Sequence, residues 1–325
     1  MSLSKEYKND LKVKAAYYYY KKNMKLADIS DSLNVSRVTL NKLLKDAVDE
    51  GIVRIEILDK DNTLSLLELE ESVKERFALQ EVIIVDSLPN NALYATNEIA
   101  LAAAKLVDRK MFSGVKISLT WGRTLEMMVK FLKGNARIKN IEVYTLLGAQ
   151  GIIDMQMQPN MIAHNLLQKY RGMGFVMNAP FMCETIEACK VIMADNNIAS
   201  IIEKSLDSDL TLVGIGPTPN ETIDADKMRY ELNVIRELKK NNVCGDIGSN
   251  FYDIYGNICK APICEQFVKV GMEKLKQHKC VVGIAGGEHK IPSILGALNG
   301  RYLDILITDK NTIVSVMEMA DLLGV

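Results

Sequence analysis

The stretch Ser118–Glu126, "SLTWGRTLE", follows an alternating apolar run that begins at Val115 and precedes an apolar periodic segment, residues 125–132. The alternation is typical of a strand, and the longer period is typical of a helix. Small residues at the passage from a strand to a helix are where α/β proteins often hold an anion. The stretch therefore predicts an α/β fold with an anion-binding turn.

Strand-like and helix-like runs alternate on both sides of this stretch. The expected strands are residues 81–86, 115–120, 140–148, 210–216, 280–287 and 302–309. The expected helices are residues 91–110, 125–132, 160–170, 224–240, 289–298 and the last segment of the chain. Strands separated by helices form βαβ units, so we expect a body over residues 81–325 with a mainly parallel sheet.

Ligands of such sheets lie beyond the carboxyl ends of the strands, so the residues that follow each strand are site candidates. Glycines let backbone N–H groups approach a phosphate, cationic side chains add positive charge, and Asp or Gln suits sugar hydroxyls. The candidates are Gly122, Arg123, Thr124, Gln150, Gly216, Asp246, Gly286, Gly287 and Lys290. Together they predict one pocket for a phosphorylated, hydroxyl-rich small molecule, whereas each loop alone could be an ordinary tight turn.

The first part of the chain has a different pattern. Apolar residues recur at helical spacing in residues 26–33, Asn34 interrupts them, and Ser36 is suited to cap a second helix that runs to about Glu50. Asn tolerates the left-handed conformation that a tight turn between helices needs. The residues of the second helix expected to point inward are Val38, Leu40, Leu43, Leu44 and Ala47.

Gly51 then ends the helix, and residues 52–57, "IVRIEI", alternate like a short strand. These features predict a winged helix-turn-helix domain over residues 1–57, whose second helix enters the major groove of DNA. The side chains expected to contact operator DNA are Ser36, Arg37, Thr39, Asn41, Lys42 and Lys45. Arg37 suits guanine and Asn41 suits adenine, whereas the two lysines are better placed for phosphates. A helical hairpin with a solvated polar face is the alternative.

The distribution of charge agrees with a head that meets a polyanion. Residues 1–57 carry 11 basic and 8 acidic side chains, whereas the rest of the chain carries 29 and 33. Tyr17–Tyr20 lie just before the two helices, and four consecutive tyrosines cannot all face one core. We expect at least one ring to contact the DNA backbone or a partner subunit, with packing against the wing as the alternative.

Other features bound the class of protein. There is no run of 18 uncharged apolar residues and no apolar segment near Met1, so we expect no membrane partner and no secretory signal. Six scattered cysteines without zinc-site spacing are typical of reduced thiols in the cytoplasm, and we expect neither a metal nor a cofactor. Residues 58–63 are polar and mark a boundary, and residues 58–80 are expected to form a linker helix.

Several segments resemble, in the same order, the signature segments of the SorC-type sugar-binding transcriptional regulators of bacteria. They are "ISDSLNVSRVTLNKLLKDAVDEGIVRIEI", "LTWGRTL", "LVGIGP", "GDIGSNFYDIYGN", "AGGEHKIPSILGAL" and "YLDILITDKNTI". The resemblance covers nearly the whole chain and extends to central glycolytic gene regulators and Bacillus-type deoxyribonucleoside regulators. It implies a Rossmann-like, sugar-phosphate-isomerase-like (NagB/RpiA/CoA transferase-like) body that binds a sugar or sugar phosphate, a homo-oligomer that is a dimer or a tetramer, and control, expected to be repression, of a carbohydrate-utilisation operon.

The resemblance also assigns roles within the predicted pocket. Gly122–Thr124 would hold the phosphate of the effector with help from Lys290, and Asp246 and Gln150 would bind sugar hydroxyls. This chain departs from the pattern at Ala149, where relatives often have a second glycine, and the added methyl group narrows the loop before Gln150.

A sugar-phosphate isomerase or deaminase with an appended DNA-binding head is the alternative function. Such chemistry needs a general base near the sugar carbons, and the candidates beside the predicted pocket are Asp246, Glu288 and His289. No nucleophile–base pair of the triad type is evident in the sequence. The head favours a sensor, because an enzyme gains nothing from it, so we expect no catalytic residue and no enzyme activity.

Overall fold

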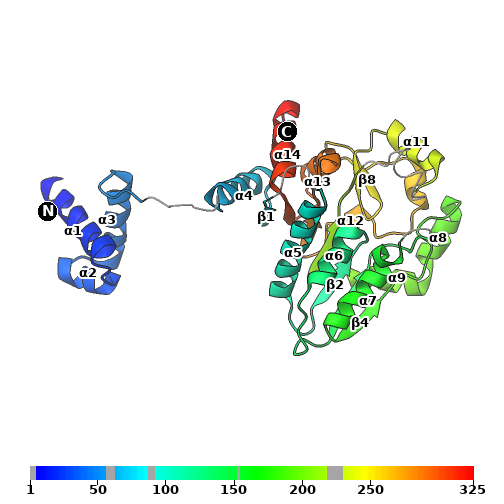
Figure 1. The fold of residues 1–325 in the computed structure, drawn as a ribbon, viewed down its shortest axis with the longest axis horizontal. Coiled ribbons are helices and arrows are strands. Elements are labelled where there is room, and N and C mark those ends of the chain that lie inside the picture. The colour runs from blue at the N-terminus through cyan, green and yellow to red at the C-terminus, as the bar shows by residue number, and fades with distance from the viewer. Residues whose placement is uncertain (1–4, 56–62, 87–91, 152–153, 218–229) are drawn as a thin grey trace. The chain divides into compact units, whose positions relative to one another are not determined.

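The chain divides into two compact units, residues 1–64 and 65–325, which we call the head and the body (Figure 1). The computed structural model describes residues 5–55, 63–86, 92–151, 154–217 and 230–325. The boundary between the units lies at the start of a helix, α4 (Thr63–Phe77), where the sequence predicts a linker helix. The polar residues 58–62 that mark the predicted boundary lie outside the described residues.

The head is a small helical unit around one apolar cluster. Its elements are α1 (Lys5–Ala16), the π-helix η1 (Tyr17–Lys21), α2 (Leu26–Leu33) and α3 (Arg37–Asp49). Ala15, Ile29 and Leu40 are fully buried between the three α-helices. Of the four tyrosines, Tyr18 packs against this cluster, whereas the other three rings are between 38% and 49% exposed.

Both helices of the predicted pair, and the turn between them, form where the sequence predicts. Asn34 is left-handed (φ 51°, ψ 47°), and the Ser36 hydroxyl accepts the N–H of Thr39 at 3.1 Å. The amide of Val35 donates to the carbonyl of Ser30 at 3.0 Å, which closes α2. The turn is thus fixed by its own backbone and by one cap, as expected for Asn and Ser at these positions.

Two expectations for the head are wrong. Residues 52–53 form bends and residues 54–55 are irregular, so no strand forms there, because the amide of Val53 donates back to the carbonyl of Ala47 at the end of α3. The rest of the expected wing, residues 56–57, lies outside the described residues. Val38 is 80% exposed, because it lies two residues from the buried Leu40, about 200° around the helix axis.

Within the described residues, seven strands of the body form one sheet in which every pair is parallel, in the order β1-β10-β9-β5-β2-β3-β4. The strands are β1 (Glu81–Val85), β2 (Lys116–Leu119), β3 (Ile141–Thr145), β4 (Gly172–Phe175), β5 (Leu210–Gly214), β9 (Val281–Ile284) and β10 (Ile305–Asp309). The predicted α/β body with a mainly parallel sheet is therefore confirmed. The strand order reverses between β2 and β5, so the chain builds the sheet outward in both directions from this point.

Helices cover both faces of this sheet, because its buried strands carry apolar side chains on both faces. Leu212 faces one apolar cluster and Val213 the other. The first cluster includes residues from α5 (Ala92–Lys110), α6 (Arg123–Phe131) and α7 (Pro159–Lys169). The second includes residues from α4, α9 (Asn196–Ser205), α11 (Leu232–Lys240), α13 (Ile291–Asn299) and α14 (Lys310–Leu323). Both faces are thus buried, as strands in a parallel sheet require.

A second, antiparallel sheet was not predicted. It consists of β6 (Gly216–Pro217), β7 (Gly245–Ile247) and β8 (Asn250–Tyr252). The remaining elements are η2 (Met155–Met157), α8 (Ile186–Ala194), η3 (Pro262–Gln266), α12 (Met272–Leu275) and η4 (Glu288–Lys290). Of the helix expected over residues 224–240, the described residues contain α11, and residues 224–229 lie outside them. None of the helices described is both long and apolar enough to cross a bilayer.

Candidate functional site

The carboxyl ends of β2 and β5 meet where the strand order reverses. Thr120, directly after β2, is buried, and its hydroxyl accepts the N–H of Gly214 at the end of β5 at 3.2 Å. In open α/β sheets a reversal of strand order opens a crevice at the carboxyl ends of the strands, and ligands bind there. Thr120 and Gly214 therefore mark the candidate site for a ligand.

Gly122 is the N-cap residue of α6, at the same edge of the sheet. Its φ of 121° is a conformation that residues with a Cβ rarely adopt, and its carbonyl accepts the first helical hydrogen bond, from Glu126, at 3.0 Å. The amide of Gly122 itself donates to the carbonyl of Met157 at 3.2 Å. The next amides have no acceptor inside the helix, so an anion at this turn would meet the N–H groups of Arg123 and Thr124. Arg123 is exposed and Thr124 is half-buried.

Asp246 lies directly over Gly216. The two residues pair between β7 and β6, and a Cβ on Gly216 would lie 2.0 Å from Oδ1 of Asp246. The carboxylate is 7% exposed, and its Oδ2 accepts the N–H of Ser249 at 2.9 Å. Because only a hydrogen fits between them, Gly216 lets this carboxylate approach the backbone that follows β5.

The hairpin that carries Asp246 also contacts β2. Its two turn residues, Gly248 and Ser249, both have positive φ (54° and 64°), which is the two-residue turn that matches the twist of paired strands. A Cβ on Gly248 would lie 2.9 Å from Cγ2 of Thr120. The hairpin tip thus packs on the residue that marks the reversal of strand order, and this brings Asp246 to the carboxyl edge of the sheet.

Lys269 supports this hairpin, and the sequence analysis missed it. Its Nζ donates to the carbonyl oxygens of Ser249 and Cys264, and it lies 5.6 and 5.5 Å from the ring centres of Phe251 and Phe267. Burial lowers the pKa of its amine to about 8. A lone lysine in the apolar run "FVKVGM" was the signal available in the sequence.

The loop after β3 joins the Gly122 turn through a second residue that the sequence analysis missed, Gln158. The side chain of Gln158 is 8% exposed, and its amide accepts from the N–H of Gln150 at 3.1 Å and donates to the carbonyl of Gln150. Its neighbour Met157 accepts from Gly122. The backbone of Ala149 forms hydrogen bonds with residues 179 and 181, which fix the start of this loop. No periodic pattern marks Gln158.

The loop after β9 completes the carboxyl edge. The amide of Gly287 donates to Oγ1 of Thr312 at 2.7 Å, and the N–H of Thr312 donates to Asp309 at 3.1 Å. A Cβ on Gly286 would lie 2.3 Å from the same aspartate. The cap of α14 thus braces this loop, and the following turn, η4, packs against β6 with half-buried Lys290 at its end.

The nine candidate effector residues therefore come from adjoining loops at one edge of the sheet. Direct contacts join Gly216 to Asp246, and the segment that contains Gln158 joins Gly122 to Gln150. Within the part of the chain that is described, no group of three or more His, Cys, Asp or Glu side chains is placed to hold a metal ion. Backbone amides, a buried carboxylate and cationic side chains suit a small anion that also carries hydroxyl groups.

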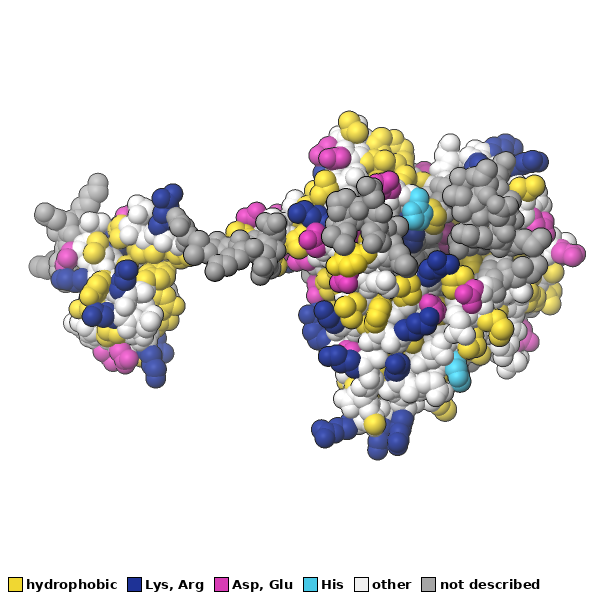
Figure 2. All heavy atoms as spheres, in the orientation of Figure 1, with side chains coloured by type: hydrophobic (Ala, Val, Ile, Leu, Met, Phe, Trp, Pro, Cys, Tyr) yellow, Lys and Arg dark blue, Asp and Glu magenta, His cyan; other side chains and the backbone are white. Residues whose placement is uncertain are grey.

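In the head, the six candidate DNA contacts divide into two groups. The hydroxyls of Ser36 and Thr39 lie 2.8 Å apart and serve the cap of α3. The other four candidates are exposed along the helix, and they are Arg37, Asn41, Lys42 and Lys45. Figure 2 shows Lys and Arg side chains beside hydrophobic ones on the visible face of the head. The fold and the site thus define a class of protein, in which a small helical head accompanies a doubly wound, ligand-binding body.

Comparison with known proteins identifies the family. A family model described as "Putative sugar-binding domain" matches residues 61–318. The sorbitol operon regulator of Klebsiella pneumoniae is 30% identical over 304 residues, which cover 92% of this chain and 95% of that protein. The deoxyribonucleoside regulator of Bacillus subtilis (strain 168) is 26% identical over 305 residues, covering 94% and 96%.

Solved structures agree with the sequence matches. The full-length sorbitol operon regulator SorC from Klebsiella pneumoniae superposes with a TM-score of 0.73 at 28% identity, covering 95% of this chain and 99% of that chain. A transcriptional regulator from Streptococcus pneumoniae TIGR4 also gives 0.73, at 26% identity, covering 79% and 98%. The chain therefore belongs to the SorC-type family of sugar-binding transcriptional regulators.

Proposed function

We propose that the chain is a DNA-binding repressor of a carbohydrate-utilisation operon whose DNA affinity is set by a sugar or sugar phosphate bound in the body. The observation that carries this proposal is the convergence at the reversal of strand order, where Thr120, Gly214 and the Asp246 hairpin meet. A candidate ligand site at this position, in a chain that also has a two-helix head suited to DNA, is what a ligand-controlled DNA-binding protein needs.

The anionic end of the effector is assigned to the start of α6. The amides of Arg123 and Thr124 and the partial positive charge of the helix end favour a phosphate, and the Arg123 side chain adds a full charge. Lys290 is assigned to the same group, because its turn packs against β6 beside Gly216. Gly286 is assigned the role of letting this loop approach Asp309 at the cap of α14, and Gly287 that of letting the effector approach the backbone.

Asp246 is assigned to bind the hydroxyl-bearing end of the effector. A carboxylate fixed by a backbone N–H is a directional acceptor for sugar hydroxyls, and its burial strengthens each hydrogen bond. Gln150 is assigned a supporting contact, since its backbone is fixed by Gln158 at the neighbouring loop. The Lys269 amine is assigned a positioning role, because it bonds the carbonyl of Ser249 in the same hairpin.

In the head, α2 and α3 are assigned as a helix-turn-helix, with α3 in the major groove of the operator. The body is assigned the fold type of sugar-phosphate isomerases, and a homo-oligomer, dimer or tetramer, that works in the cytoplasm. An effector changes DNA affinity only through its differential affinity for two arrangements of such an oligomer. We therefore propose that effector binding changes the spacing of paired heads.

The family membership favours a sensor over an isomerase or deaminase, since the matched relatives are named as regulators. The site agrees with this preference. The candidate bases Glu288 and His289 are exposed, and the Asp246 carboxylate is fixed by the backbone of its own hairpin.

The test is a thermal-melt panel of free and phosphorylated sugars and polyols, followed by an assay of each ligand for consumption. A stabilising ligand that is recovered intact supports the sensor. A response to phosphorylated ligands alone supports the phosphate site at α6, and a response to free sugars alone removes it. Conversion of a stabilising ligand to product would contradict the regulator and favour the enzyme.

A further inference from the structure

The first turn of α3 presents an apolar side chain to solvent. Val38 is 80% exposed, and it is the second residue of the helix. The buried residues of α3 are Leu40, Leu43, Leu44 and Ala47, which leave Val38 on the opposite side of the helix. Packing within the head therefore does not explain a valine at this position.

The surroundings of Val38 are cationic. With about 100° between successive residues, Val38 lies between Lys45 and Lys42 on the helical wheel, and Arg37 and Asn41 lie on the same exposed arc. The acidic residues of α3 begin only at Asp46. The exposed arc of the first two turns is thus an apolar side chain bordered by positive charge, which is complementary to the floor and walls of a DNA groove.

The conformation of this turn is also fixed before binding. The Ser36 hydroxyl accepts the Thr39 amide, and the two hydroxyls lie 2.8 Å apart, so Val38 is held between two capping residues. Valine itself has one strongly preferred rotamer in a helix. A rigid apolar group at the leading end of the helix loses little conformational entropy on binding.

In the major groove, the C5-methyl group of thymine is the apolar feature that distinguishes one base from the other three. We propose that Val38 reads a thymine in each operator half-site through this methyl group. The proposal rests on the proposed DNA-binding function of the head and adds a base-reading residue that makes no hydrogen bond. It predicts that discrimination at one position of the operator depends on a methyl group and on Val38 together.

The experiment first selects operator sequences from random DNA with the wild-type protein. Each thymine of the selected site is then replaced by deoxyuridine, which removes only the methyl group, and the Kd is measured by fluorescence anisotropy. At one thymine per half-site we expect wild-type affinity to fall about three- to tenfold, as for loss of one buried methyl contact. Val38→Ala should lose a similar factor on thymine DNA and be insensitive to deoxyuridine there.

Val48→Ala is the matched control, because Val48 is an exposed valine near the other end of α3. It should keep the wild-type response to deoxyuridine. If Val38→Ala and the wild type respond equally to deoxyuridine at every thymine, the assignment of Val38 is overturned while the regulator stands. If no DNA sequence can be selected at all, the proposed function is overturned together with this assignment.

Discussion

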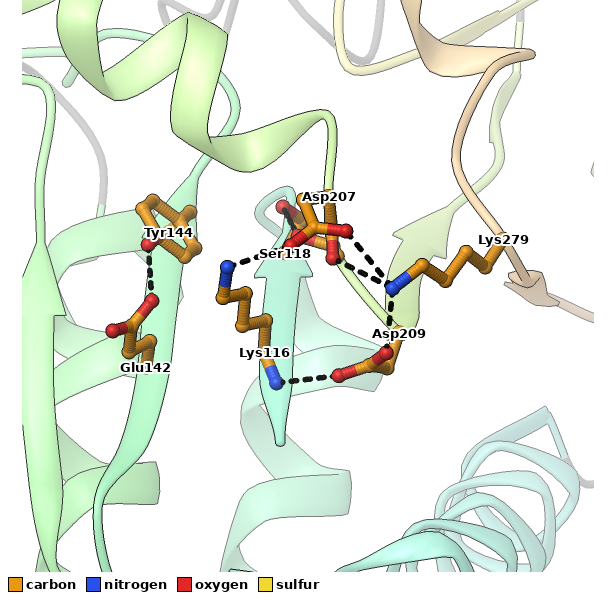
Figure 3. A network of polar contacts seen from close by, with 8 residues as sticks. Lys116, Ser118, Glu142, Tyr144, Asp207, Asp209 and Lys279 are labelled. Carbon is orange, nitrogen blue, oxygen red and sulfur yellow. Dashed lines mark hydrogen bonds and ion pairs between the residues drawn. The ribbon is translucent and has the colours of Figure 1, made fainter. Parts of the chain in front are cut away.

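The two edges of the parallel sheet hold their polar groups in opposite ways. At the amino edge, Lys116 of β2 pairs with Asp207 at 2.7 Å, and Lys279 pairs with Asp207 and Asp209 at 2.9 and 3.0 Å (Figure 3). On the adjacent β3, the hydroxyl of Tyr144 donates to Glu142. These contacts link the beginnings of β2, β5 and β9 through side chains, and the Asp207 and Lys279 side chains are largely exposed.

At the carboxyl edge, glycines lie at or after the ends of the same strands, and the buried carboxylate of Asp246, on β7, lies beside Gly216. Asp246 is 7% exposed, whereas the Asp207 side chain is 60% exposed. Lys116 and Lys279 hold the pKa of Asp207 down, at about 2, but solvent screens these pairs. The comparison teaches that charged side chains pair with one another at the amino edge, whereas at the carboxyl edge small residues let neighbouring loops and a buried carboxylate pack closely, where we propose that a ligand binds.

The largest effect is expected for Lys269→Ala at the carboxyl edge. The change leaves the buried carbonyl oxygens of Ser249 and Cys264 without their donor, at about 1–3 kcal/mol each, so the body should lose about 4 kcal/mol of stability. Urea denaturation of the body measures it. Lys274→Ala, at an exposed lysine on α12, is the control and should be nearly neutral. Equal midpoints for both variants would contradict a structural role for Lys269.

The second prediction concerns His278, a buried group at the amino edge, which is expected to make the free energy of unfolding depend on pH. His278 is 5% exposed with Nδ1 2.6 Å from Oγ1 of Thr211, and burial lowers its pKa to about 4. The unfolded chain takes up this proton below about pH 6.5 and the folded chain only below about pH 4. Stability is therefore complete above pH 6.5 and is lost as the pH falls through this window, by up to about 3 kcal/mol.

Denaturation of wild type and His278→Gln between pH 7 and about pH 4.5 checks this expectation. The wild type should lose stability more steeply, because only its folded state resists protonation at this position. Parallel pH profiles would mean that His278 does not contribute to acid sensitivity.

Gly216→Ala should reduce effector affinity by tenfold or more. Its Cβ would lie 2.0 Å from Oδ1 of Asp246, so the carboxylate must leave the position that the Ser249 amide fixes. The control is Gly271→Ala, because a Cβ there meets no atom within 4 Å. Isothermal titration with a ligand found in the thermal panel gives the affinities. Unchanged affinity in Gly216→Ala would remove Asp246 from the site.

The smallest effect is expected for Asp207→Asn at the amino edge. The pairs of this aspartate are exposed, so its loss should leave the urea midpoint at pH 7 within experimental error. Because the pKa of Asp207 is lowered, whatever its ion pairs contribute to stability is present at pH 7 and is lost only as the pH falls from about 4 to about 2. A clear shift at pH 7 would show that the two edges are less different than their exposure indicates.

The sheet was predictable because its strands are short apolar runs separated by helices. The missed elements lack that signal: β4 reads "GMGF" and its first three residues are exposed, and β7 and β8 have three residues each. Helix α4 also buries only part of its apolar residues, since Leu67 is 51% exposed while Val73 and Phe77 are buried. Short strands and helix faces depend on tertiary partners that a sequence does not display.

The candidate site was predictable to the extent that it follows the ends of strands. Gly122 and Gly216 follow β2 and β5 and were chosen by that rule, whereas Asp246 lies on β7 and reaches Gly216 through a sheet that was not predicted. Gln158 and Lys269 were not found, because each bonds backbone groups of another loop, and no periodic pattern marks such a contact. Val38 was misplaced because an apolar residue on a helix was taken as inward, although its spacing from Leu40 excludes it.

The pairing of β1 with β10 has a consequence for synthesis on the ribosome. Arg76 bonds Asp321 at 2.6 Å, and the amide of Gln80 donates to the carbonyl of Asp304, so the first and last elements of the body are neighbours. The head is complete after 64 residues, whereas the sheet closes only when β10 has left the exit tunnel. The residues of the head therefore leave the ribosome long before the last strand of the body, and a chain that ends early would contain the head without a complete sheet.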